Sequence, residues 1–154
     1  MPGKRYKVLF ICRDNAVHSI MAEALLKRWG GTDFCAFSAG IKPAGAIDPR
    51  TVELLKERRI WQGGLHSKSR QEFFERDAPR MDFVISLGEC PPENMPKEWP
   101  GNPQIFHWRI TSPERAGTPA EAASALVKAL TELETRVKLF VLVYKKEMTK
   151  RTAA

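Results

Sequence analysis

The sequence predicts one α/β domain built around a parallel β-sheet. Short apolar runs alternate with longer segments of helical periodicity, which is typical of strand–helix–strand units. No repeat or change in composition marks a domain boundary, and 154 residues suffice for a single core. We expect this domain to span residues 1–144, followed by a basic C-terminal tail over residues 145–154. Because exposed termini are usually poorly ordered, we interpret the tail as a frayed, solubilising segment rather than a binding patch.

The first half of the chain predicts two strands and two helices. Residues 8–11 form an apolar run that is typical of a buried strand, which we expect to span residues 6–11. Apolar periodicity from Ser19 to about residue 29 predicts a helix that the following glycines end, and Ser19 is placed to help cap it. Residues 34–38 predict a second strand. The Asp48-Pro49 pair predicts the start of a second helix, with an N-cap followed by proline at the first helical position.

The second half completes the alternation. A short helix is expected over residues 71–76. Residues 81–87 are nearly continuously apolar, which predicts a strand in the centre of the sheet. Residues 104–108 predict a short fourth strand. From Thr118 to about residue 144, apolar residues recur at spacings of three and four, so we expect a long closing helix that packs across the sheet.

A polar loop carrying one cysteine lies between the first strand and the first helix. It consists of Cys12, Arg13, Asp14, Asn15, Ala16, Val17, His18 and Ser19. The order strand, loop, helix directs backbone N–H groups and a helix N-terminus at one point, which attracts oxyanions. A thiol at that point is expected to have a lowered pKa, because the helix dipole favours the thiolate. We therefore interpret Cys12 as a reactive thiol and not as an inert buried cysteine.

This loop resembles the anion-binding loop of the low-molecular-weight protein tyrosine phosphatase superfamily, and most closely that of its arsenate reductase branch. The family loop has a cysteine, five residues, then arginine and serine, with asparagine three places after the cysteine; Cys12, Asn15 and Ser19 match. Further motifs match in the same order, namely Met21-Ala22-Glu23, Ser38-Ala39-Gly40, Ser67-Lys68-Ser69, Met81-Asp82-Phe83-Val84, Trp99-Pro100-Gly101 and His107-Trp108. The resemblance covers roughly residues 6–142. It implies a four-stranded parallel sheet flanked by helices on both faces, a flavodoxin-like three-layer sandwich with the loop at the carboxyl edge.

The loop departs from the family pattern at positions that carry chemistry. His18 stands where the family has arginine, and it cannot reproduce the two parallel hydrogen bonds of a guanidinium. It is interpreted either as a substitute cationic donor or as a tolerated polar residue. Asp14 replaces the usual glycine and is expected to repel an anion. Ser112 occupies the position where the family has an aspartate that acts as the general acid. A serine hydroxyl is a poor proton donor in that role. The catalytic candidates are thus Cys12, His18 and Ser112.

The resemblance also implies a requirement for further thiols. Arsenate reductases of this branch use two additional cysteines to resolve the arseno-cysteine adduct, and those positions are Gly88 and Pro96 in this sequence. Cys90 is a possible displaced resolving thiol, and Cys35 is expected to lie in the core. Three cysteines without zinc-site spacing indicate neither a disulfide framework nor a metal site. No resident cofactor is expected; a reductive cycle would draw on an external thiol reductant such as glutathione, glutaredoxin or thioredoxin.

Two functions from different classes remain as hypotheses, with a third ranked below them. The first is an arsenate-reductase-like or phosphatase-like protein that binds phosphate, arsenate or sulfate in the loop, with weak or lost catalysis. The second is a non-enzymatic oxyanion-sensing or partner-binding protein on the same scaffold. The third is nucleic-acid binding, prompted by a net charge of +7, but the chain lacks the interleaved aromatic residues of single-strand sites. No apolar run approaches membrane-spanning length and no signal-peptide pattern is present, so we expect a cytoplasmic protein without a membrane partner.

Overall fold

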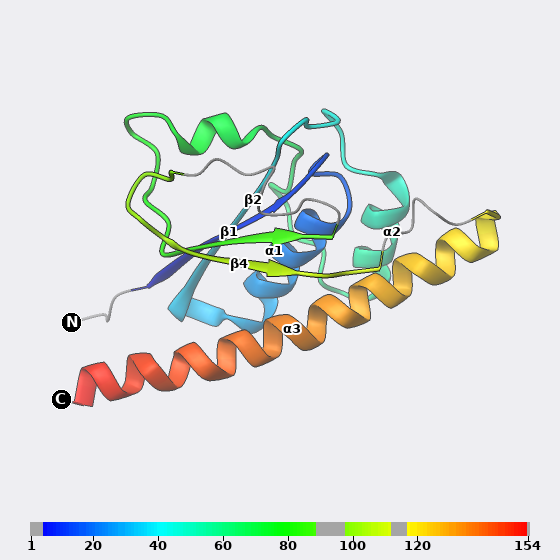
Figure 1. Cartoon of the computed structure of the whole chain (residues 1–154). Helices are drawn as coiled ribbons and strands as arrows, with labels where there is room; N and C mark the ends of the chain where they lie inside the picture. The colour runs from blue at the N-terminus through cyan, green and yellow to red at the C-terminus, as the bar shows by residue number, and fades with distance from the viewer. Residues whose placement is uncertain (1–4, 89–97, 112–116, 154) are drawn as a thin grey trace.

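The computed structural model describes residues 5–88, 98–111 and 117–153, with side chains as far as residue 145. Strands and α-helices alternate along the chain (Figure 1). Their order is β1 (Tyr6–Cys12), α1 (His18–Trp29), β2 (Phe34–Gly40), α2 (Pro49–Glu57), β3 (Phe83–Leu87), β4 (Gln104–Trp108) and α3 (Pro119–Ala153). Two short 3₁₀ helices, η1 (Gly31–Asp33) and η2 (Arg70–Phe73), lie in the connections.

The four strands form one parallel sheet in the order β2-β1-β3-β4. The apolar segment assigned to the third strand is therefore internal, as its composition predicts, although β3 begins two residues later, at Phe83. In the paired register, Cys12 lies opposite Gly40 and Leu87 lies opposite Trp108. All four strands consequently end at the same edge of the sheet, and the cysteine-bearing loop begins at that edge.

Helical segments cover both faces of the sheet, which confirms the expected layers. On one face the side chains of β1, such as Val8 and Phe10, pack with residues of α1, α2 and α3. On the other face, Leu9 and Ile11 pack with residues around η2, including Phe73. Figure 1 shows α1 and α3 along one side of the sheet and η2, drawn in green, on the other. The alternation of buried side chains along β1 is therefore what holds the three layers together.

The start of α1 and the end of α3 differ from expectation, whereas the start of α2 does not. Helix α1 begins at His18 with Val17 at its cap position, and no side chain caps it. The expected cap by Ser19 is wrong, because the Ser19 hydroxyl is engaged by Cys12 and Asn15 instead. The cap of α2 is confirmed, since the Asp48 carboxylate accepts a hydrogen bond from the Arg50 N–H at 2.8 Å.

Helix α3 continues to Ala153 instead of ending near residue 144, so the basic segment forms the last turns of the helix and not an irregular tail. This segment contains neither glycine nor proline, and lysine, glutamate and methionine favour helix. Before it, Phe140 and Tyr144 pack edge-on or tilted against Phe83. Within the described ranges, no helix combines the length and apolar character needed to cross a bilayer.

Candidate active site in the Cys12 loop

Residues 12–19, which we call the Cys12 loop, connect β1 to α1 at the carboxyl edge of the sheet. The backbone of this loop is fixed by the segment that follows β2. Carbonyl oxygens of the loop accept hydrogen bonds from amides of that segment: Cys12 from Ile41 (3.2 Å), Arg13 from Lys42 (2.8 Å) and Asp14 from Ala44 (2.9 Å). Further along, the Ala16 carbonyl accepts from the Asp48 N–H at 3.1 Å. These hydrogen bonds within the chain hold the loop backbone in position without a ligand.

Asn15 is the structural centre of the loop. It is fully buried and has a φ of 50°, a left-handed conformation that asparagine adopts more readily than most residues. Its Nδ2 donates to Ser19 Oγ at 2.7 Å and to Ser38 Oγ at 3.0 Å, and its Oδ1 accepts from the Lys68 N–H at 2.8 Å. The Asn15 amide therefore joins the loop to α1, to β2 and to the segment before η2.

Close approach of the backbones explains the glycine that ends β2. A Cβ added at Gly40 would lie 3.0 Å from the Asn15 N and Cβ atoms. The matching motifs around Ser38 and Lys68 thus correspond to physical contacts with Asn15 and not only to sequence similarity.

The thiol of Cys12 is buried, with 4% of the residue exposed. Its Sγ accepts a hydrogen bond from the Asn15 N–H at 3.2 Å, lies 2.9 Å from Ser19 Oγ and donates to Asp14 Oδ1 at 3.5 Å. The pKa of Cys12 is raised to about 11, mainly by burial and to a lesser extent by the negative charge of Asp14, although the hydrogen bonds from Ser19 and Asn15 lower it. The expected lowering of the thiol pKa is wrong, because desolvation outweighs the favourable groups at the helix terminus.

Alkylation of Cys12 tests this pKa. With a pKa near 11, the thiolate fraction at neutral pH is roughly two orders of magnitude below that of an ordinary cysteine, so the rate should be lower by about that factor and rise steadily with pH. The rate with a small reagent is followed by mass spectrometry of the Cys12 peptide. Asp14→Asn should shift the profile to lower pH. A wild-type rate that levels off below pH 9 would contradict the assignment.

Asp14 places a carboxylate beside the thiol. Its Oδ1 accepts from the Ala16 N–H at 3.1 Å as well as from the thiol. The side chain is half-buried, while neighbouring Arg13 is exposed and Val17 is buried. One amide of the loop therefore already binds a carboxylate oxygen from within the chain, and this agrees with the expectation that Asp14 disfavours an anion.

His18 has 9% of its surface exposed and lies at the start of α1. Its Nε2 donates to the Thr111 carbonyl oxygen at 2.9 Å. The other side of the ring faces Gly88, which has a φ of 63°, and a Cβ added there would lie 2.8 Å from His18 Nδ1. Thr111 in turn donates from its N–H and its hydroxyl to the Glu132 carboxylate on α3, both at 2.8 Å. One nitrogen of His18 is thus committed to the backbone, and the ring cannot form a two-bond clamp.

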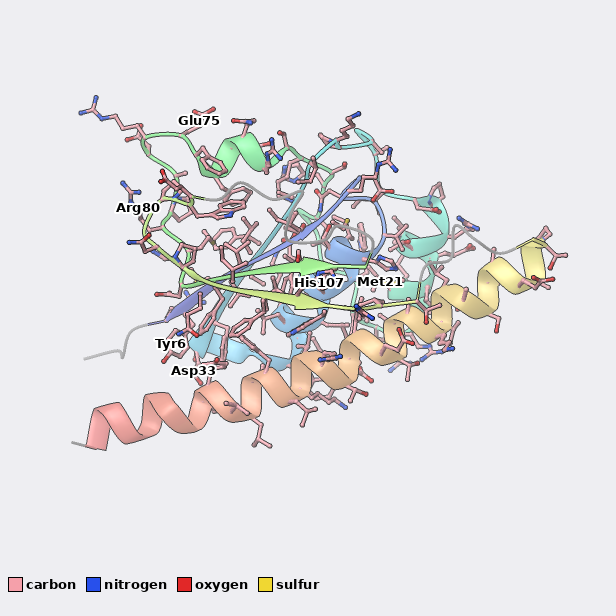
Figure 2. All side chains as sticks on the ribbon, in the orientation of Figure 1. Tyr6, Met21, Asp33, Glu75, Arg80 and His107 are labelled. Atoms are coloured by element: carbon pink, nitrogen blue, oxygen red, sulfur yellow. The ribbon has the colours of Figure 1, made fainter. Side chains whose placement is uncertain are left out.

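Some of the remaining candidate site residues lie outside the described residues, namely Ser112, Cys90 and Pro96. Cys35 is half-buried on the edge strand β2, and not in the core as expected. His107, labelled on β4 in Figure 2, pairs through Nδ1 with Ser86 Oγ of β3 at 2.8 Å, which agrees with a structural role in the sheet. No cluster of three metal-binding side chains exists among the residues described.

A partly buried ionic network that local sequence patterns did not reveal joins α1 to the segment before η2. Glu23 on α1 is buried, accepts from the Ser38 hydroxyl and pairs with Lys27 at 2.8 Å. The Lys68 ammonium lies 3.7 Å from Glu23 and donates to Ser38 Oγ at 3.4 Å. Burial lowers the pKa of Lys68, although the charge of Glu23 opposes this. A sequence signal existed: Glu23 follows Ser19 by one helical turn, which places a carboxylate on the buried face of α1.

The sequence of the chain is similar to those of known proteins. The family model for low molecular weight phosphotyrosine protein phosphatase matches residues 7–151. An arsenate reductase of Halalkalibacterium halodurans is 27% identical over 134 residues, which cover 86% of this chain and 93% of that protein. A glutaredoxin arsenate reductase of Synechocystis sp. is 30% identical over 108 residues, covering 70% of this chain and 79% of that protein.

Solved structures show the same fold. An arsenate reductase in its phosphate-binding state superposes with a TM-score of 0.73 at 25% identity, over 89% of this chain and 97% of that one. A thioredoxin-dependent arsenate reductase of Corynebacterium glutamicum gives a TM-score of 0.62 at 28% identity, over 90% of this chain and 65% of that one. The sequence match and the fold extend over nearly the whole chain, and the chain therefore belongs to the low molecular weight phosphotyrosine protein phosphatase family, within its arsenate reductase branch.

Proposed function

We propose that the protein binds phosphate or arsenate, and less tightly sulfate, in the Cys12 loop, with catalysis that is weak or lost. The observation that carries this proposal is the Cys12 thiol at the start of the loop, with the Asn15 N–H and the Ser19 hydroxyl directed at its sulfur. A related arsenate reductase has been solved in a phosphate-binding state, which supports an oxyanion as the ligand.

Three features support weak catalysis. The Cys12 thiol is largely protonated at neutral pH, because burial and Asp14 raise its pKa to about 11. His18 supplies no bidentate clamp, and the loss of one well-placed oxyanion donor costs about 3 kcal/mol at a transition state. Ser112 replaces the carboxyl group of the general acid, whose loss typically lowers the rate by ~10²–10⁴-fold.

Any residual chemistry is thiol-dependent. With arsenate, the Cys12 sulfur forms a bond to arsenic while an arsenate oxygen leaves as water. An external thiol then attacks that sulfur, so that the S–As bond breaks, arsenite departs with the electron pair, and a mixed disulfide forms at Cys12. A second external thiol attacks this disulfide and restores the Cys12 thiol. One relative is a glutaredoxin arsenate reductase, which supports glutathione with glutaredoxin as the reductant. A thioredoxin-dependent relative is also known, but this chain lacks a thiol at the first relay position, Gly88.

The alternative is a non-enzymatic oxyanion-sensing or partner-binding protein. The occupied Ala16 N–H and the His18 bond to Thr111 favour it, because both commit loop groups to partners within the chain. Thiol-dependent turnover separates the two functions. Arsenite formation that disappears in Cys12→Ser supports the enzyme, whereas oxyanion binding without any turnover supports the sensor.

Binding itself is tested by titrating ¹⁵N-labelled protein with phosphate and with arsenate. The amide signals of Asn15 and Ala16 should shift on a common saturation curve with each anion, since these amides flank the thiol. Glu75, exposed and remote from the loop, provides an amide that should not move. Absence of saturable shifts in the loop with both anions would contradict the proposal.

Thioredoxin as sole reductant is expected to support no arsenite formation. The first relay position is Gly88, which has no thiol, and disulfide geometry tolerates little displacement toward Cys90. Adding glutathione with glutaredoxin should permit whatever slow turnover exists, because these reductants need no second cysteine in the chain. Arsenite is measured against Cys12→Ser as a blank. Robust production with thioredoxin alone that is abolished by Cys90→Ser would show that Cys90 is a resolving thiol.

A further inference from the structure

Asp14 introduces a hydrogen-bond acceptor at the place where an oxyanion would approach the thiol. Its Oδ1 lies 3.5 Å from Cys12 Sγ and accepts from the Ala16 N–H at 3.1 Å. The carboxylate therefore lies against the same sulfur and the same loop amide that a bound anion would contact. A tetrahedral anion beside Sγ would have one oxygen facing this carboxylate.

A backbone movement that took the Asp14 carboxylate away from the thiol would break other hydrogen bonds of the loop. Its carbonyl oxygen accepts from the Ala44 N–H at 2.9 Å and from Ser67 Oγ at 3.2 Å. The next residue, Asn15, is buried and makes three side-chain hydrogen bonds. Only the side-chain torsions of Asp14 are left to adjust when a ligand arrives.

An ionised carboxylate accepts hydrogen bonds and donates none. An oxyanion without a proton therefore brings an acceptor oxygen against the acceptor oxygen of Asp14. Both oxygens lose their hydrogen bonds to water, and no hydrogen bond forms between them. Hydrogen phosphate and hydrogen arsenate keep a proton at neutral pH and can donate it to Asp14, whereas sulfate has none. His18, bonded to the Thr111 carbonyl, does not offer the paired donors that would offset the repulsion.

We propose that Asp14 makes the Cys12 loop selective for protonated oxyanions, so that hydrogen phosphate and hydrogen arsenate bind and sulfate is largely excluded. This inference rests on the proposed oxyanion site and specifies its ligand class. An unpaired acceptor of this kind weakens binding by roughly ten- to a hundredfold, which sets the expected preference for phosphate over sulfate.

The decisive comparison uses hydrogen phosphate and sulfate at about pH 8.5, where both are tetrahedral dianions that differ by one proton. Dissociation constants are measured at constant ionic strength from the Asn15 and Ala16 amide shifts. Wild type should bind phosphate at least tenfold more tightly than sulfate. In Asp14→Asn the ratio should fall below threefold, chiefly because sulfate gains affinity: the amide still offers an oxygen to the Ala16 N–H and adds an N–H₂ donor.

Two further variants keep the test interpretable. Asp77→Asn removes the same charge at an exposed position and should leave the ratio unchanged. Asp14→Gly removes the acceptor altogether and should also abolish the preference, which covers the case of a misfolded Asp14→Asn protein. Equal affinities of wild type for both dianions, or a preference that survives in both Asp14 variants, would overturn the role of Asp14 while the oxyanion site stands. Absence of binding by either anion would overturn the proposed function together with this inference.

Discussion

Replacing Asp14 by glycine and His18 by arginine in one variant is expected to raise Cys12-dependent hydrolysis of a small aryl phosphate by about 10²-fold. Arginine supplies two parallel charge-assisted hydrogen bonds to a phosphoryl group, which histidine cannot. Glycine removes the carboxylate 3.5 Å from Sγ, and with it one of the two causes that raise the Cys12 pKa. Release of the phenol is measured against Cys12→Ser in each background. Either substitution alone should give a smaller gain.

A matched variant distinguishes loop chemistry from a general change of charge. Asp77→Gly removes the same kind of side chain at an exposed position and should give no gain. Adding Ser112→Asp to the loop variant should raise the rate again, since the family's general acid occupies that position and such a group contributes ~10²–10⁴-fold. A folded loop variant without any Cys12-dependent gain would leave the non-enzymatic function as the better account.

Asn15→Ala is expected to lower the free energy of unfolding by about 3–5 kcal/mol, because it removes two buried hydrogen bonds and a partly buried one and leaves Ser38 and the Lys68 N–H without this partner. At roughly 2–4 °C per kcal/mol for a chain of this size, the melting temperature should fall by about 10 °C. Chemical and thermal denaturation measure both quantities.

Asn102→Ala provides the control for backbone strain. Asn102 has the same φ of 50°, but it is exposed. Its replacement therefore reports the conformational cost alone, which should be about 1 kcal/mol. If the two variants lost equal stability, the Asn15 side-chain hydrogen bonds would contribute nothing beyond that cost, contrary to the geometry.

Features with a local cause were predictable from the sequence. The central position of β3 follows from its nearly continuous apolar run, and the start of α2 follows from Asp48 and Pro49. The loop at the carboxyl edge of β1 follows from the order of strand, cysteine and helix. In each case a few adjacent residues decide the outcome, so their pattern is sufficient.

Features that depend on residues distant in sequence were not predictable in this way. The residues next to Cys12 in the sequence favour a low thiol pKa, whereas the pKa is set mainly by burial, which the whole fold creates. Ser19 looks like a cap by position, yet Asn15 and Cys12 engage its hydroxyl. Lys68 belongs to the site only because the fold brings it to Glu23, 45 positions earlier in the chain.

The close approach of Gly88 to His18 restricts which side chains can occupy both positions at once. A side chain at position 88 meets His18 Nδ1 at 2.8 Å, and the ring cannot turn away without breaking its bond to Thr111. The positive φ of Gly88 adds a cost for any residue other than glycine. Replacing Gly88 by cysteine while His18 is retained should therefore destabilise the fold, and replacing His18 by a smaller residue should relieve part of that cost.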